Sequence, residues 1–164
     1  QDSLDFTAGF ARFELSPSIL EAFDVPEIDV ADSRILPDSG YVVIRKNAAM
    51  DPLEKSQIIA NRFSKLHTFY DATTRIRGKY RYTANGMYDY LDEEESTWPI
   101  AFQSIKPDTS GMTIGLAEIE EKDEFSISPY FGYRGNVQLE ADQEPICFKV
   151  AILIQNSCKN LQTT

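Results

Sequence analysis

Residues of two kinds alternate along the stretch Thr73 to Gly86, TTRIRGKYRYTANG, and this alternation constrains the fold more than any other feature. The cations occupy every second position, at Arg75, Arg77, Lys79 and Arg81. Because side chains leave a β-strand on opposite faces with a period of two, the stretch predicts a strand with one cationic face. The other face would carry Ile76, Gly78, Tyr80 and Tyr82. Asn85 and Gly86, at the end of the stretch, predict a tight hairpin turn.

Short segments with strand character occupy most of the chain, separated by turn residues or acidic residues. Before the stretch they are FARFELS, interpreted as a half-buried strand, and YVVIRK; after it they are MYDYL, WPIAFQSI, GMTIGLAEI, EFSIS, YRGNVQLE and ICFKVAILIQ. Pro99 confines its strand to a sheet edge or falls among its first residues. The last segment is apolar on both faces, which predicts a central, well-covered strand. The pattern predicts an all-β fold: an antiparallel β-sandwich, with a jelly roll of about eight strands fitting best.

One segment predicts a helix between the early strands. Asp51 is suited to the N-cap, Pro52 to the first helical position, and Glu54 to an acidic capping box. Downstream, the apolar side chains follow the spacing of one helix face, at Ile59, Phe63, Leu66 and Tyr70. We therefore expect a short helix from Pro52 to about His67.

The predicted pattern of strands divides the chain into three parts: an extended N-terminal segment with one strand at 1–40, a jelly-roll domain at 41–155, and a tail at 156–164. Prolines and aspartates interrupt the region from Pro17 to Asp38, which leaves room for at most a helical turn near Ile19 to Phe23. Since the sequence begins at Gln1, a processed N-terminus is expected. Removal of a secretory signal, excision from a polyprotein and trimming all remain open.

Charge and composition weigh against several classes of protein. The net charge of −10 argues against a protein built to bind nucleic acid, and no apolar run is long enough to span a bilayer. The single histidine, His67, is expected near the helix end, facing away from the apolar stripe, and no Gly-rich phosphate loop is present. We therefore predict no enzyme, and no catalytic, metal-binding or cofactor-binding residue. The acidic runs at Asp92 to Glu95 and Glu118 to Glu124 are interpreted as solvated loops, although a glycosidase pair or a calcium site would look the same.

Two groups of residues are candidates for contacts. The cations Arg75, Arg77, Lys79 and Arg81 have three candidate partners: the chain's own acidic runs, an acidic surface of a neighbouring subunit, or RNA phosphates. The candidate aromatic contacts are Trp98, Tyr130, Phe131 and Tyr133, which suit either a core and subunit interface or the stacking of sugar rings. Cys147 is expected to be a buried small apolar residue and Cys158 a free thiol, with a short-range disulfide left open.

The order of these elements resembles a known family. After the capped segment come FYDATTRIRGKYRYTANG, then EKDEFSISPYFGYRGN with its Ser-Pro-aromatic turn, and last the apolar CFKVAILIQN. From Met50 to Gln155 this succession resembles the jelly-roll coat proteins of icosahedral positive-strand RNA viruses, of the picorna-like order.

The resemblance implies a structural capsid subunit in the virion, assembled in the host cytoplasm. Its partners would be copies of itself and sister coat proteins in an icosahedral shell around an RNA genome, with weak RNA contacts inside and a host receptor outside. The segment from Pro17 to Asp38 would then be an arm that orders against neighbours. No cofactor is implied. The alternatives are a secreted β-sandwich module that binds a glycan or protein, an enzyme on a β-sandwich, and a phage or appendage structural protein.

Overall fold

The computed structural model describes residues 3–149 and 152–154, and in this part the chain is all-β, with antiparallel sheets and no α-helix. The largest sheet has nine strands. In spatial order they are β15 (Cys147–Lys149), β14 (Gly135–Glu140), β11 (Thr113–Ile119), β10 (Thr97–Pro107), β9 (Arg81–Leu91), β8 (His67–Gly78), β7 (Leu53–Ala60), β4 (Ser33–Leu36) and β3 (Ile28–Val30). Most neighbours in this sheet are consecutive along the chain, so it is largely an up-and-down meander.

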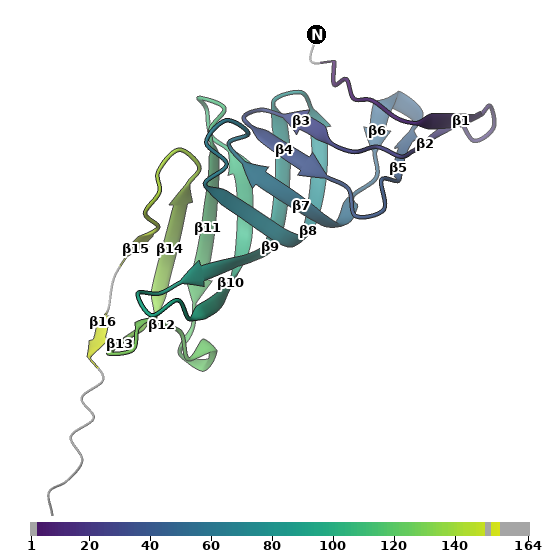
Figure 1. Ribbon diagram of the computed structural model, residues 1–164. Helices are drawn as coiled ribbons and strands as arrows, with labels where there is room; N and C mark the ends of the chain where they lie inside the picture. Colours follow the sequence, from purple (N-terminus) through teal and green to yellow (C-terminus); the bar gives the residue numbers. More distant parts are fainter. Residues whose placement is uncertain (1–2, 150–151, 155–164) are drawn as a thin grey trace, which may run out of the picture.

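Two smaller sheets lie at opposite ends of the large one (Figure 1). One has four strands, in the order β1 (Phe10–Glu14), β2 (Ile19–Phe23), β5 (Val42–Arg45) and β6 (Ala49–Met50). The other has three, in the order β12 (Ser126–Ser128), β13 (Phe131–Tyr133) and β16 (Ile152–Ile154). Two single 3-10 turns, η1 (Lys46–Ala48) and η2 (Glu121–Asp123), complete the structure.

The nine-stranded sheet is curled into a half-barrel (Figure 1). Four strands stand between β4 and β11, so a flat sheet would separate them by about 24 Å at about 4.8 Å per strand. The hydroxyl oxygens of Ser33 on β4 and Thr113 on β11 are nevertheless 2.7 Å apart. The curl therefore brings the concave faces of distant strands into contact.

A closed hydroxyl cluster holds the two sides of the curl together. The hydroxyl of Tyr82, on β9, lies 3.1 Å from Ser33 Oγ and 2.7 Å from Thr113 Oγ1. Asp32 accepts hydrogen bonds from the Thr113 hydroxyl at 2.6 Å and from its backbone N–H at 2.9 Å. Burial raises the pKa of Tyr82 to about 12, so the phenol stays protonated and able to donate. We call Asp32, Ser33, Tyr82 and Thr113 the hydroxyl clasp.

The apolar core fills the concave side of the curl. Its largest fully buried side chains include Phe69 and Phe102, whose rings meet edge to face with centroids 5.2 Å apart. Ile58, Ile105 and Leu139 are also completely buried. These five residues come from four strands of the large sheet, β7, β8, β10 and β14, so the core is shared across the half-barrel.

The predicted helix from Pro52 to His67 is wrong. Its first half is β7, in which Ser56, Ile58 and Ala60 are buried at every second position. Its second half is a turn, where Asn61 Oδ1 accepts hydrogen bonds from the backbone N–H groups of the residues two and three positions on. Phe63 is 81% exposed, so the helical stripe is not buried as a face. The period-two burial and the Asn61 turn outweighed the capping signals.

The hairpin turn expected at Asn85 and Gly86 is also wrong. Both residues lie inside β9, paired with β8 at Asn85 and with β10 at Gly86. A side chain at Gly86 would put its Cβ 2.9 Å from that of Ala72, so this glycine serves close approach of two strands. The actual turn lies between β8 and β9, where Gly78 has φ +146°.

Most of the other strand predictions are confirmed: the segments MYDYL, WPIAFQSI, GMTIGLAEI, EFSIS and YRGNVQLE fall on β9, β10, β11, β12 and β14, and YVVIRK on β5. Pro99 is the third residue of β10, among its first residues as expected. The all-β antiparallel class is confirmed as well.

The two ends of the sequence were predicted less well. Residues 1–40 contain four strands instead of one, and Ile19–Phe23 is β2, not a helical turn. FARFELS forms β1, but this strand is fully exposed, not half-buried. The last segment is not a central strand: β15 is an edge of the nine-stranded sheet, and its Cys147 is exposed. Cys158 and the predicted tail at 156–164 lie outside the described residues.

Candidate assembly interface

The four predicted cations lie around the β8–β9 hairpin. Arg75 and Arg77 are exposed on β8, Lys79 is in the turn, and Arg81 begins β9. Between them Ile76 and Tyr82 are buried, as the alternation predicted. Tyr80 is not: it belongs to the turn, and its side chain is exposed.

One of these cations has an acidic partner at a place different from the one expected. Lys79 lies 3.9 Å from Asp5, in the N-terminal segment and not in either acidic run. Arg75 and Arg77 form no ion pair with the part of the chain that the structure describes. They therefore present two solvent-facing charges, and their contact with a neighbouring subunit stays a prediction.

The first acidic run has a structural role at Asp92. Its carboxylate accepts hydrogen bonds from Trp98 Nε1 at 3.0 Å and from the backbone N–H groups of Glu94 and Ser96 at 2.9 and 2.8 Å. These bonds, with that of Trp98 the strongest, hold the pKa of Asp92 below its usual value. Asp92 therefore shapes the β9–β10 loop.

The four candidate aromatic residues separate into two pairs. Trp98 is half-buried against Phe125, with ring centroids 6.0 Å apart, and Tyr133 is buried in the same cluster, 6.3 Å from Phe125. Tyr130 and Phe131 are exposed at the β12–β13 turn. The structure thus brings Trp98 and Tyr133 together in the core and leaves the other two on the surface.

His67 occupies a different place from the one expected. It begins β8 and is almost fully buried. Its Nε2 lies 2.7 Å from the carbonyl oxygen of Gln143, which can only accept, so Nε2 carries a proton. In the neutral ring Nδ1 then accepts from the Tyr88 hydroxyl, 3.1 Å away. His67 is a satisfied core residue that joins β8 to the loop after β14.

The most exposed apolar segment lies elsewhere, in the hairpin Phe10–Phe23, which we call the β1–β2 arm. It lies at the outer end of the four-stranded sheet, away from the half-barrel (Figure 1). All five residues of β1 are exposed, and among the strands of residues 3–149 and 152–154 β1 pairs with β2 alone. Phe13 is 58% and Leu15 84% exposed. One feature of the sequence indicates this exposure. Phe10 and Phe13 lie on opposite faces of the strand, so no single face can bury both.

An apolar row crosses the four-stranded sheet from the arm inward. The register places Phe13 opposite Leu20, Leu20 opposite Ile44, and Ile44 opposite Met50. Residues directly opposite each other share a face, so one side chain from each strand contributes to the same apolar surface. We call Phe13, Leu20, Ile44 and Met50 the apolar row.

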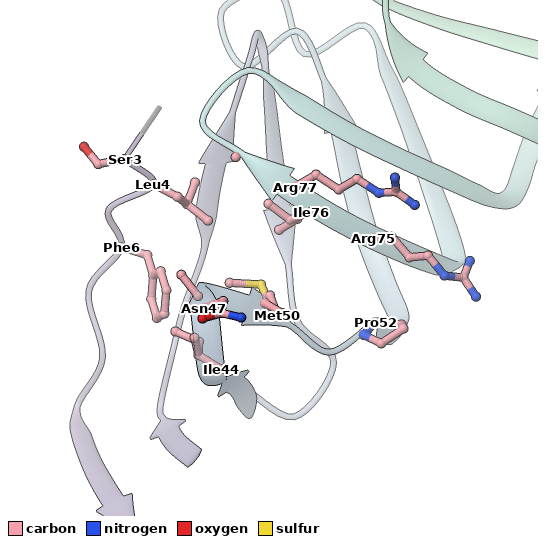
Figure 2. A pocket seen from close by; sticks show the side chains of 13 residues that line it. Ser3, Leu4, Phe6, Ile44, Asn47, Met50, Pro52, Arg75, Ile76 and Arg77 are labelled. Carbon is pink, nitrogen blue, oxygen red and sulfur yellow. The ribbon is translucent and has the colours of Figure 1, made fainter. Parts of the chain in front are cut away.

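The inner end of the apolar row opens into a groove of about 670 Å³ between the four-stranded sheet, β8 and the N-terminal segment. Figure 2 shows Ile76 pointing toward Leu4 and Met50, whereas Arg75 and Arg77 point away on the other side of β8. The groove is therefore apolar at its centre, with the two arginines on its flank.

The other face of the arm is charged. Arg12 Nε donates to Glu21 at 2.8 Å across the β1–β2 pair, and the Tyr41 hydroxyl donates to the same carboxylate at 2.5 Å. These two hydrogen bonds, that of Tyr41 first, lower the pKa of Glu21. Phe10 stacks on Phe23 beside them, with centroids 4.7 Å apart. The arm therefore has internal structure of its own, although it is exposed.

Within the described residues, no group of three or more His, Cys, Asp or Glu side chains is arranged to hold a metal ion. The same residues include no helix with the length and apolar character needed to cross a membrane. The chain matches no protein-family model, no curated protein and no solved structure.

Proposed function

We propose that this chain is an assembly subunit, a structural protein without catalytic activity that packs against other protein chains. The observation that carries the proposal is the β1–β2 arm, whose outer strand exposes Phe10 on one face and Phe13 on the other. Large exposed apolar surfaces are uncommon on monomers and are typical of contact sites.

The energetics favour a covered arm. Burying a large apolar side chain contributes about 1.5–3 kcal/mol, and Phe13 and Leu15 both remain largely in water in the isolated chain. A neighbouring subunit would recover this contribution. A small projecting hairpin is also a part of the molecule that another chain can contact without disturbing the half-barrel.

The resemblance gives the proposal its most specific form. In that form the chain is a coat subunit that forms an icosahedral shell with sister proteins around an RNA genome, and the sandwich and jelly-roll arrangement remain expectations attached to it. Only the first part of the predicted arm of such a subunit, Pro17 to Asp38, overlaps the β1–β2 arm. The rest forms β3 and β4 of the nine-stranded sheet, where Ile28 and Ile35 are fully buried within the chain itself.

Cross-linking followed by sedimentation of the native material tests the proposal. We expect the chain to sediment faster than a monomer and the cross-links to include residues of the arm. A monodisperse monomer that carries no cross-linked protein, even when concentrated, would contradict the proposal. Particles of uniform diameter in electron micrographs would support the coat-subunit form specifically.

The exposed cations provide a separate check on the assembly surface. If Arg77 contacts an acidic neighbour, Arg77→Glu reduces assembly and the native assembly weakens as salt is raised. A matched control is Lys122→Glu, which changes an exposed cation paired with Glu120 on η2. Equal assembly of both variants would exclude the β8 cations from the contact.

A further inference from the structure

The outer edge of β1 is an unpaired strand edge. Among the described strands β1 has a single neighbour, β2, so every second residue of β1 directs its N–H and C=O groups away from the sheet. Proteins usually protect such edges with lysines, prolines or a covering loop. Here the edge strand is FARFE, and all of its residues are exposed. The outward N–H and C=O groups of β1 can therefore pair with one more strand.

The sequence of this edge is complementary to itself. When two copies of β1 run antiparallel with Phe13 opposite Phe13, each Arg12 lies opposite the partner's Glu14. Ala11 lies opposite the partner's Leu15 on the other face. Opposite charges directly across a strand pair stabilise it, and like charges destabilise it. Symmetric registers centred on Arg12 or on Glu14 would place like charges face to face. Of the registers centred on a residue of β1, only the one centred on Phe13 pairs opposite charges.

We propose that two copies of this chain associate by antiparallel pairing of their β1 strands, with Phe13 at the two-fold axis. This rests on the proposed assembly function and names its contact. Two four-stranded sheets would merge into one continuous sheet across the dimer. The contact is isologous, because the same patch is used on both copies, so it closes without leading to a fibre.

This register adds an apolar contact on one face of the joined sheet and a charged contact on the other. On one face, the apolar row of each copy ends at Phe13, so the two rows meet there and continue across the axis. On the other face, Arg12 already contacts its own Glu21 and, at 3.6 Å, its own Glu14, and it would lie beside the partner's Glu14 as well. The guanidinium has five N–H donors in a planar fork, and its present bonds to Glu21 use two of its nitrogens, Nε and one Nη. A donor therefore remains for the partner's carboxylate.

The association should be weak. A contact made by one strand and its flanking side chains lies at the small end of interface sizes, below about 1,200 Å². We therefore expect micromolar to submillimolar dimerisation of the isolated chain, which sedimentation equilibrium from about 10 µM to 1 mM would detect.

Charge reversal tests the register directly. In the full chain, Arg12→Glu gives an edge with two acids, and Glu14→Arg gives an edge with two bases. We expect the dimer dissociation constant of each variant alone to rise at least about tenfold. An equimolar mixture of the two should restore dimers, because each acidic edge then faces a basic one. Glu14→Arg keeps the hydrogen bond from Arg12 to Glu21 but removes the 3.6 Å ion pair between Arg12 and Glu14 of the same chain, so circular dichroism of the isolated variant checks that it still folds. Lys122→Glu, which changes the charge by the same amount as Arg12→Glu, is the net-charge control for that variant.

Wild-type dimers, weakened single variants and recovery in the mixture support the pairing. Variants that dimerise like the wild type, or a mixture that fails to recover while circular dichroism shows folded chains, overturn it. A wild-type chain that is monomeric when pure, but whose arm cross-links to a different protein in native material, overturns the pairing and leaves the assembly function standing. Absence of any cross-linked partner removes both.

Discussion

The β1–β2 arm and the half-barrel are built from the same kind of alternating sequence and end in opposite environments. In β4 the alternation separates buried Ser33 and Ile35 from partly exposed neighbours. In β1 the same period leaves every residue exposed, with a phenylalanine on each face. Alternation therefore identifies strands reliably, but burial depends on whether another layer covers the face. The half-barrel covers its own concave face by curling, whereas no other described part of the chain covers β1.

Of the substitutions that compare the half-barrel with the arm, Phe102→Ala in the core should lower the free energy of unfolding the most. The ring is fully buried and packs against Phe69 at 5.2 Å, so its loss should lower the free energy of unfolding by about 3–5 kcal/mol. Urea unfolding followed by circular dichroism measures this. A loss below about 1 kcal/mol would mean that the half-barrel is packed as loosely as the arm.

The hydroxyl clasp should show the next largest effect. Thr113→Val keeps the shape of the side chain but removes the hydroxyl that donates to Asp32 and contacts Ser33 and Tyr82. Buried polar groups left unpaired should lower the free energy of unfolding by about 1–3 kcal/mol. Thr113→Ser, which retains the hydroxyl, is the matched control for the same urea titration. If the two variants were equally stable, the hydrogen bonds would not be what holds the curl.

The loop at Asp92 gives a pH-dependent effect. Because its folded pKa lies below the unfolded value of about 3.9, the ionised carboxylate stabilises the fold above that value. This contribution is lost as the pH falls through the lower folded pKa. In Asp92→Asn, the dependence of unfolding free energy on pH below about 4 should be shallower than in the wild type. Parallel pH profiles for the two proteins would show that Asp92 does not contribute.

The arm should show the smallest effect on the stability of the isolated chain. Because Phe13 is largely exposed, Phe13→Ala should change the free energy of unfolding by no more than about 0.5 kcal/mol under dilute, monomeric conditions. The same variant should weaken self-association, since it removes the residue at the proposed axis. A loss of stability comparable to that of Phe102→Ala would mean that the arm is part of the folded core.

The sequence allowed the strands from β8 to β14 of the large sheet to be predicted, because their burial follows their period. It did not reveal β3 and β4, which lie in the segment expected to be an extended meander. It did not reveal β7 either, since Asp51, Pro52 and Glu54 at its start carry strong helix-start signals and its stabilising partners lie on β4 and β8. Local propensity was outweighed by tertiary pairing. The Asn85–Gly86 signal failed for a related reason: the small size of Gly86 serves contact with Ala72, which no local rule reveals.

The candidate site was less predictable than the fold. The cations and two of the four aromatic residues are on the surface, but nothing in their spacing distinguishes Tyr130, at the surface, from Tyr133, in the core. The exposed β1 was interpreted as half-buried because alternation was taken to imply a covered face. The apolar row depends on the pairing of four strands, so it becomes visible only once the register is known.

The hydroxyl clasp also has a consequence for synthesis of the chain. Ser33 and Thr113 are separated by 80 positions, and a ribosome adds about 5–20 residues per second. Thr113 is therefore synthesised roughly 4–16 s after Ser33, so β4 cannot form the hydroxyl clasp during that interval. The hairpin that carries Phe13 precedes both and is available throughout that interval. On a polysome, neighbouring nascent chains could thus meet through their first strands before any of them has a closed half-barrel, so the order of translation itself favours subunits that find each other early.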